Sequence, residues 1–199
     1  MGTRGFISFN VDGDLKTAYN HFDSYPDGLG LAVLRYLRAV TAAGAMPEIR
    51  EKARALRVVD GETKPTPEEI EQLRPYSDEG VSRQTLDDWY CLLRRTQGNP
   101  GLILEAGVIE DASEFPGDSL FAEWGYVIDF DNDGRLEAYR GFQRQRHSAG
   151  RFADMKPRDH TVPGVDGYFP VTLLASWPLA ELPSDQDFLA ALAEGEEEE

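Results

Sequence analysis

GFISFNVDGDLKTAYNHF, residues 5–22, predicts a β-hairpin near the start of the chain. Apolar and polar side chains alternate from Ile7 to Val11, which is the two-residue period of a half-buried strand. Asp12-Gly13-Asp14 provides turn residues, and the chain then returns through a second run from Leu15 to Phe22. The stretch therefore predicts two antiparallel strands, with a polar segment directly after the second one.

A second hairpin is predicted by residues 123–142, EWGYVIDFDNDGRLEAYRGF. Its two alternating runs flank Asp131-Asn132-Asp133-Gly134, which is typical of a turn between antiparallel strands. Phe169 to Trp177 has the composition of one further strand. Helical spacing of apolar residues and capping residues predict helices over 29–43, 48–56, 66–74, 82–97, 102–106 and 184–192.

This order of elements predicts an α+β fold with a mainly antiparallel sheet and packed helices. We expect one domain over residues 1–193, followed by a disordered acidic tail over 194–199, where five of the six residues are glutamates. Residues 143–167 show little periodicity and exceed the usual length of a connection. They therefore form either a binding loop or a disordered segment.

The chain has 199 residues, 41% of them hydrophobic, and a formal net charge of −16. This charge disfavours direct binding to the phosphate backbone of nucleic acids. It is compatible with ordinary solubility or with a surface that imitates nucleic acid toward a basic partner. The sequence shows neither an apolar run of membrane-spanning length nor a secretory signal pattern, so we expect a cytoplasmic protein without membrane contact.

The sequence does not predict a metal, cofactor or disulfide site. Cys91 is the single cysteine, and its apolar neighbours are typical of a core residue. The three histidines are too scattered for a recognisable metal spacing. Asp129, Asp131 and Asp133 resemble the start of an EF-hand loop, but Arg140 occupies the position that needs a glutamate. We therefore expect a hairpin turn there.

Thr3 directly follows Gly2, just before the first predicted strand. The junction is similar to that of N-terminal-nucleophile hydrolases, including proteasome β subunits, where cleavage of a Gly-Thr bond frees a catalytic threonine. The freed α-amine, with a pKa of about 8, would take the proton of the threonine hydroxyl. This chemistry requires the removal of both Met1 and Gly2. The alternative is that Thr3 is an ordinary residue at the edge of a strand.

Asn20-His21-Phe22-Asp23 resembles the Arg-Asn-x-Asp-like element that follows the first hairpin of choloylglycine hydrolases, which share the N-terminal-nucleophile fold. Asn20 stands where that family has an arginine. The resemblance implies that Asp23 orients the nucleophile, and the Asn20 amide is a candidate oxyanion donor. His21 and Tyr25 are candidate binding residues on the same segment. Alternatively, its aromatic rings pack in the core while its polar side chains bond to turn amides.

Three stretches, residues 1–5, 19–26 together with Gly28 and Gly30, and 123–129, resemble an uncharacterised group of bacterial and phage-type proteins that open with Met-Gly-Thr-Arg-Gly. The resemblance implies one continuous domain that unites the two hairpins. It implies no particular activity.

Residues 140–160 reverse the charge of the chain, with six lysines and arginines against two aspartates. This segment could form an anion-binding loop for a phosphate, a carboxylate or an acidic partner segment. Its candidate binding residues are Arg144, Arg146, His147, Arg151 and Arg158. Alternatively, these cations pair with carboxylates of the protein itself.

The residues support two hypotheses about function. The first is an amide-bond hydrolase of the N-terminal-nucleophile type, with Thr3 as nucleophile, Asp23 and Asn20 in support, and the basic loop holding an anionic substrate group. The second is a non-catalytic acidic interaction protein, such as a phage or mobile-element accessory factor. Neither the small molecule or protein partner nor the oligomeric state follows from the sequence.

Overall fold

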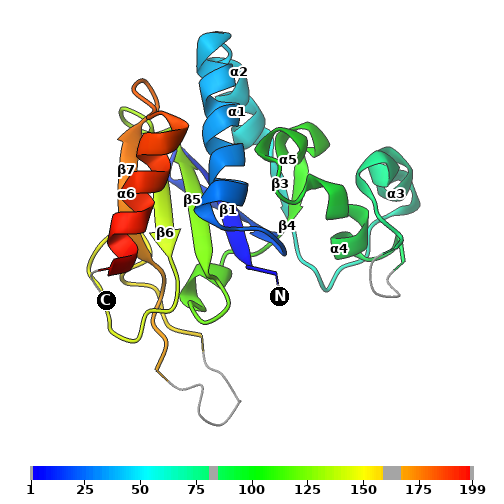
Figure 1. Ribbon diagram of the computed structural model, residues 1–199. Coiled ribbons are helices and arrows are strands. Elements are labelled where there is room, and N and C mark those ends of the chain that lie inside the picture. Colours follow the sequence, from blue (N-terminus) through cyan, green and yellow to red (C-terminus); the bar gives the residue numbers. More distant parts are fainter. Residues whose placement is uncertain (1, 81–84, 159–166, 198–199) are drawn as a thin grey trace.

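A five-stranded sheet lies at the centre of the computed structural model, which describes residues 2–80, 85–158 and 167–197 (Figure 1). The strand order is β2-β1-β5-β6-β7. The bounds are Gly5–Val11 for β1, Asp14–Asn20 for β2, Trp124–Asp129 for β5, Arg135–Arg140 for β6 and Thr172–Pro178 for β7. β1 and β5 run parallel, and the other neighbouring pairs are antiparallel. Both predicted hairpins are confirmed, and the parallel pair joins them.

β1 lies between two neighbouring strands, and all of its residues are buried. Phe9 packs on the side of the helices, whereas Phe6 belongs to the cluster on the opposite face. Ser8 is buried as well, and its hydroxyl is hydrogen bonded to that of Thr17 at 2.8 Å. The prediction of a half-buried first strand is therefore wrong, because β1 is covered on both faces.

The turns of the two hairpins bind each other. Asp131 accepts hydrogen bonds from the backbone N–H of Asp12 (2.7 Å) and of Gly13 (2.8 Å). Asn10 Nδ2 donates to Asp129 Oδ1 (2.7 Å) and Asp131 Oδ2 (3.0 Å). A carboxylate that accepts backbone N–H groups forms strong, charge-assisted hydrogen bonds. The aspartates of the second hairpin thus form a turn, as expected, and also fix the first hairpin.

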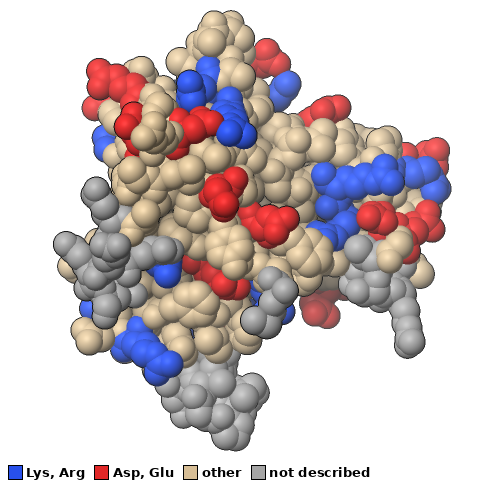
Figure 2. All heavy atoms as spheres, viewed as in Figure 1, with Lys and Arg blue, Asp and Glu red and all other residues tan. Residues whose placement is uncertain are grey.

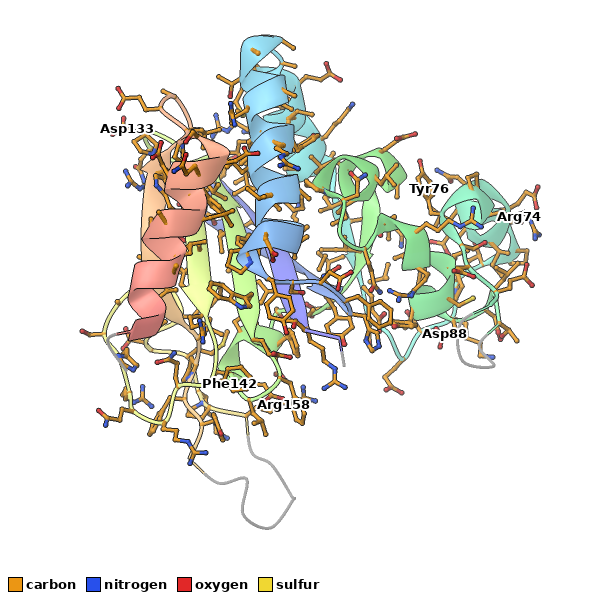
Figure 3. The ribbon with its side chains drawn as sticks, viewed as in Figure 1. Arg74, Tyr76, Asp88, Asp133, Phe142 and Arg158 are labelled. Atoms are coloured by element: carbon orange, nitrogen blue, oxygen red, sulfur yellow. The ribbon has the colours of Figure 1, made fainter. Side chains whose placement is uncertain are left out.

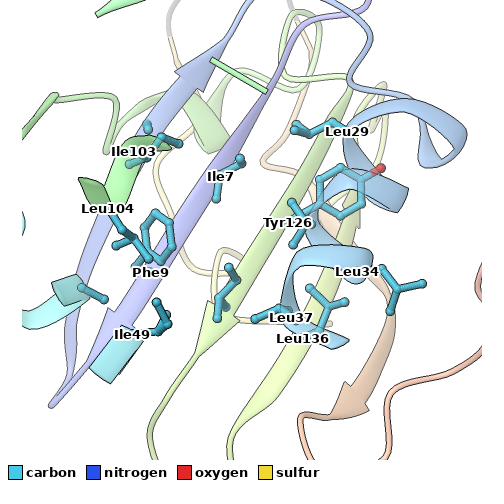
Figure 4. Close-up of a cluster of buried hydrophobic side chains, with 14 of the residues drawn as sticks. Ile7, Phe9, Leu29, Leu34, Leu37, Ile49, Ile103, Leu104, Tyr126 and Leu136 are labelled. Atoms are coloured by element: carbon cyan, nitrogen blue, oxygen red, sulfur yellow. The ribbon is translucent and has the colours of Figure 1, made fainter. Parts of the chain in front are cut away.

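Four helices pack on one face of the sheet (Figures 1 and 4). They are α1 (Leu31–Ala42), α2 (Met46–Ala55), α5 (Pro100–Ala106) and α6 (Asp185–Glu197). Figure 4 shows Leu34 and Leu37 of α1 close to Tyr126 and Leu136 of the sheet. The opposite face is covered by loop residues, among them Phe152 of the predicted basic loop. The core therefore has two layers, one on each face of the sheet.

A side lobe follows α2 and contains a second, smaller core. Its strands β3 (Arg57–Val59) and β4 (Val108–Glu110) pair in parallel, and its helices are α3 (Pro67–Leu73) and α4 (Trp89–Leu92). The short 3₁₀ helices are η2 (Arg74–Tyr76) and η3 (Arg94–Thr96), with η4 (Phe115–Gly117) after β4. The capping box predicted at Thr66 is present at the start of α3. Cys91 is fully buried in this lobe, as the sequence predicts.

Most predicted helices agree with the structure to within a few residues, and two elements differ more. In its described part, the predicted helix over 82–97 is confirmed only for α4, because Asp88 caps a new start at Trp89 and the chain leaves α-helical geometry at Leu93. Its residues 82–84 lie outside the described ranges. α6 extends to Glu197, so it includes part of the acidic stretch that was predicted to be disordered.

The segment between β2 and α1 is folded tightly against the sheet. It ends in a short π-helix, η1 (Pro26–Gly30), whose Leu29 N–H donates to the backbone oxygen of Asp23 at 2.8 Å. A Cβ at Gly28 would lie 2.3 Å from that same oxygen, so only glycine fits there. Tyr126 Oη donates to the backbone oxygen of Ser24 at 3.2 Å and fixes the segment from below.

The architecture is mixed α and β in one compact domain, with a mainly antiparallel sheet. In the described ranges, no helix combines the length and the apolar character that crossing a membrane requires. Figure 2 shows acidic and basic side chains interspersed on the viewed face, with uncharged surface between them.

Candidate functional site

A cleft of about 460 Å³ lies between the end of β2 and the segment that contains α4 and η3. Tyr19 lines it from β2, Tyr90 lines it from α4, and residues 109–115 after the start of β4 complete it. We call it the tyrosine cleft. Figure 3 labels Arg158, which lines the cleft from below the sheet, and Asp88, which precedes α4 on the other side. Its volume is within the range of small-molecule sites.

Aromatic rings form much of the cleft wall. The ring of Tyr19 meets that of Phe115 edge to face, with centroids 5.1 Å apart, and lies 6.4 Å from that of Tyr90. Trp89 also lines the cleft, and its indole N–H donates to the Thr63 backbone oxygen at 2.7 Å. Rings held in this way offer a planar ligand apolar surface without a large loss of side-chain freedom.

His21 lies beside the cleft and is held by three groups. Its Nδ1 is 2.7 Å from Tyr19 Oη, its backbone N–H donates to Gln97 Oε1 at 3.1 Å, and its ring meets that of Phe22 at 4.4 Å. Burial, followed by the charges of Arg94 and Arg4, holds the pKa of His21 below its ordinary value of 6.5. The imidazole is therefore neutral at pH 7, and Nε2 is its nitrogen without a hydrogen bond to a described residue.

Arg4 and Arg94 supply positive charge at this place, and we call them the arginine pair. The guanidinium of Arg94 lies 4.7 Å from the ring centre of Phe22 and 5.3 Å from that of Tyr90. It also donates to Gln97 Oε1. The guanidinium of Arg4 lies 5.2 Å from the ring centre of Phe121. Cation–π contacts orient both side chains without neutralising their charge.

Glu110, the last residue of β4, brings a carboxyl group to the tyrosine cleft. Burial, with a contribution from Asp88, raises the pKa of this carboxyl above its ordinary value of 4.5. No described residue forms a hydrogen bond or ion pair with it. The cleft therefore offers a ligand an acceptor or, when protonated, a donor.

The predicted catalytic residues gather around Ser24. Its backbone N–H donates to the Thr3 backbone oxygen at 3.2 Å, and Asn20 Nδ2 donates to its hydroxyl at 2.8 Å. Asp23 precedes Ser24 and lines a neighbouring cleft of about 240 Å³ together with Asn20 and Arg94. Thr3 is only 2% exposed, and its hydroxyl has no hydrogen-bond partner among the described residues. Thr3 lines neither cleft.

The alternative expectation for this segment, that its rings pack in the core, holds only in part. Tyr19 is half-buried, but Phe22 and Tyr25 are 48% and 47% exposed. Asn20 is buried and donates to the backbone oxygen of Phe22 at 2.5 Å, so its amide does stabilise the turn. The predicted binding residues His21 and Tyr25 are both accessible at the surface.

The predicted basic-loop residues are separated from one another. Arg151 forms ion pairs with Asp129 (2.6 Å) and Glu137 (2.8 Å) across the sheet. Arg144 donates to Tyr168 Oη, Arg146 donates to the backbone oxygen of Ala153, and His147 is exposed. Arg158 alone lines the tyrosine cleft, 3.7 Å from a carboxylate oxygen of Asp118. His160 and the remainder of the segment through residue 166 lie outside the described residues.

Four residues of this site carry little local sequence signal: Arg4, Tyr90, Arg94 and Glu110. They meet because the fold brings three distant segments together. The four-residue spacing of Tyr90 and Arg94, which suits a contact on one helical face, could have pointed to one part of the site. In the described ranges, no group of three or more His, Cys, Asp or Glu side chains is arranged to hold a metal ion.

Comparison of the chain with protein-family models, with curated proteins and with solved structures gives no match.

Proposed function

We propose that the protein binds a small organic ligand that contains a planar ring, and that the ring occupies the tyrosine cleft. The observation that carries this proposal is the convergence of Tyr19, Tyr90 and Phe115 on one cleft of about 460 Å³. Concave sites lined by aromatic rings with a few polar groups are the usual form of small-molecule sites. Glu110 and Arg158 provide such polar groups at the same cleft.

Phenol tests this proposal, since it carries a ring and no charge at neutral pH. We expect it to shift the NMR signal of the Trp89 indole N–H, which belongs to a residue of the cleft wall. Tyr90→Leu removes one ring and should weaken phenol binding about fivefold, which corresponds to ~1 kcal/mol for an aromatic contact.

Tyr168→Leu is the matched control, because Tyr168 contacts Arg144 and lines neither cleft. The proposal fails if phenol leaves the Trp89 signal unmoved. It also fails if the two variants weaken phenol binding equally.

A second candidate function is the N-terminal-nucleophile hydrolase, for which the supporting observation is the proximity of Thr3, Asn20 and Asp23 to Ser24. In this proposal, removal of Met1 and Gly2 frees the Thr3 amine and opens its buried hydroxyl to a substrate. An N-terminal-nucleophile-like fold is part of the same proposal.

The intact mass of the protein from its native host tests the hydrolase. Loss of both Met1 and Gly2 would support it, whereas retention of Gly2 would remove the proposed base and overturn it. The non-catalytic acidic interaction protein, as an accessory factor of a phage or mobile element, stays a prediction.

A further inference from the structure

The electrostatic environment of His21 differs from that of the protein as a whole. The chain carries a net charge of −16, yet the charged groups that shift the pKa of His21 are the two guanidiniums of Arg94 and Arg4. The charges of both arginines also lower the pKa of Tyr19 and Tyr90, against the opposite effect of burial, and these two residues form two sides of the tyrosine cleft. The carboxyl groups of Glu110 and Asp88 raise the pKa of Tyr90. Two guanidiniums therefore lie close to the tyrosines of the cleft, whose own lining includes the carboxyl groups of Glu110, Asp111 and Glu114.

The arginine pair has no carboxylate partner among the described residues. Arg94 donates to the neutral amide oxygen of Gln97, and the backbone N–H of Arg4, rather than its guanidinium, donates to Glu123. Elsewhere in the described chain, arginines commonly pair with carboxylates; Arg35, Arg38, Arg50, Arg54, Arg57, Arg74 and Arg151 do so. Carboxylates are in excess in this protein, yet these two half-buried arginines have no carboxylate partner among the described residues.

Each guanidinium is held by contacts that leave hydrogen-bond donors available. Arg94 lies between the rings of Phe22 and Tyr90, and Arg4 lies over Phe121. A guanidinium has five N–H donors, and its planar arrangement matches a carboxylate or a phosphate. Nε2 of His21, in the same cluster, is a further polar group without a described partner.

We propose that the arginine pair binds the anionic group, a carboxylate or a phosphate, of a ligand whose ring lies in the tyrosine cleft. This proposal rests on the function proposed above, because it assigns the substituent that the ring carries. The shared chemistry is a planar ring with an anion attached to it. The sequence predicts an anion site in the basic loop, residues 140–160. The proposal places the anion site instead at Arg4, just before β1, and at Arg94, in η3.

The experiment compares four probes by calorimetric titration of the full chain: phenol, benzoate, phenyl phosphate and inorganic phosphate. We expect benzoate or phenyl phosphate to bind at least about tenfold more tightly than phenol, since charge-assisted hydrogen bonds add to the ring contact. The tighter of the two identifies the anion as a carboxylate or a phosphate. Added salt should weaken this binding and leave phenol unaffected.

Arg94→Gln and Arg4→Gln should each reduce the affinity for the tighter anionic probe about tenfold, while the affinity for phenol stays within twofold. Arg95→Gln is the matched control. It removes the same charge from the next residue in the chain, whose side chain is exposed and forms no ion pair with a described residue. Two separate variants keep the test decisive if one of them fails to fold.

The outcomes separate the two proposals. If phenol binds and the anionic probes bind no more tightly, the arginine pair is not an anion site and this inference is overturned, while the ring-binding function stands. If inorganic phosphate binds as tightly as phenyl phosphate, the anion site stands and the ring-binding function fails. If Arg95→Gln has the same effect as Arg94→Gln, only the overall charge matters and the inference is likewise overturned.

Discussion

Two groups of arginines in this protein differ in what surrounds their guanidiniums. In the first, which we call the Arg151 cluster, Arg151 contacts Asp129, Glu137 and Tyr139 across β5 and β6. In the second, the arginine pair lies against Phe22, Tyr90 and Phe121 and has no carboxylate partner among the described residues. The arginine of the first cluster is paired with carboxylates, whereas the two arginines of the second are not.

This difference shows that the pairing of a charge in the folded structure cannot be read from its place in the sequence. Arg151 belongs to the strongest positive stretch of the chain, but its guanidinium serves to fasten the loop to the sheet. Next to it, Phe152 is buried against Phe6 and Tyr139. Arg4 and Arg94 belong to no such stretch, and yet they lie beside the tyrosine cleft.

The largest expected effect of a single change is on stability, at the Arg151 cluster. Arg151→Ala should lower the free energy of unfolding by roughly 3 kcal/mol, because it leaves two mostly buried carboxylates without their cation. The side chains of Asp129 and Glu137 are each only 13% exposed. Urea unfolding monitored by circular dichroism measures this change.

Arg144→Ala serves as the control, since Arg144 is exposed and makes no ion pair with a described residue; it should change stability by less than about 0.5 kcal/mol. Equal effects of the two substitutions would show that the Arg151 cluster does not fasten the loop.

The second effect is the acid sensitivity that the Arg151 cluster confers. Burial raises the pKa of Asp129, but hydrogen bonds from Asn10, the Asp131 N–H and Arg151 outweigh it and hold this pKa below 3.8. A carboxyl whose pKa is lower in the folded state stabilises the fold above its unfolded pKa, and this contribution is lost as the pH falls through the folded value.

Stability should therefore decrease on acidification below about pH 4, and it should decrease less in Arg151→Ala, which lacks part of the interaction. Urea midpoints at a series of pH values measure the slope. An acid slope that is identical in the wild type and the variant would contradict this account of Asp129.

The third effect is a small change in the free energy of unfolding when a member of the arginine pair is replaced. Arg94→Gln should change the free energy of unfolding by less than about 0.5 kcal/mol, because the guanidinium has no carboxylate to leave unpaired. Parallel urea unfolding of Arg94→Gln and Arg151→Ala compares the two clusters directly. A loss above about 2 kcal/mol in Arg94→Gln would mean that Arg94 has a structural role like that of Arg151.

The smallest effect is a shift in the titration of His21. Its pKa should lie below 6.5, because burial and the two arginines disfavour the imidazolium, and Arg94→Gln should move it upward. Because the folded pKa is the lower one, the contribution of His21 to stability is present above pH 6.5 and decreases as the pH falls through the folded value. NMR titration of the ring signals tests this, and a pKa that is unchanged in Arg94→Gln would contradict the proposed contact.

Much of the fold could be predicted from the sequence because its signals are local. The alternation in residues 5–22 and 123–142 and their turn residues predict both hairpins, and the capping residues at Thr66 predict α3. The parallel pairing of β1 with β5 could not be predicted, since it depends on contacts between residues more than one hundred positions apart. One consequence is Gly125, where a Cβ would overlap the ring of Phe6.

The candidate site was predicted only in part for the same reason. His21 and Asn20 follow a recognisable hairpin, so their place near a site could be expected from sequence. For Arg94 the sequence offers only its four-residue spacing from Tyr90, because the predicted helix over 82–97 breaks at Leu93 and the resulting 3₁₀ turn determines where the guanidinium lies. The basic loop has a clear charge signal in the sequence, but the pairing of Arg151 with Asp129 and Glu137 depends on the fold of the sheet.

The most direct test of the central claim is the affinity of Arg94→Gln for the tighter of benzoate and phenyl phosphate, measured by calorimetry beside its unfolding free energy. We predict an affinity about tenfold lower than that of the wild type, with stability unchanged to within about 0.5 kcal/mol. Unchanged affinity would contradict the claim that the arginine pair is an open anion site. A loss of stability comparable to that of Arg151→Ala would show instead that the two clusters have the same structural role.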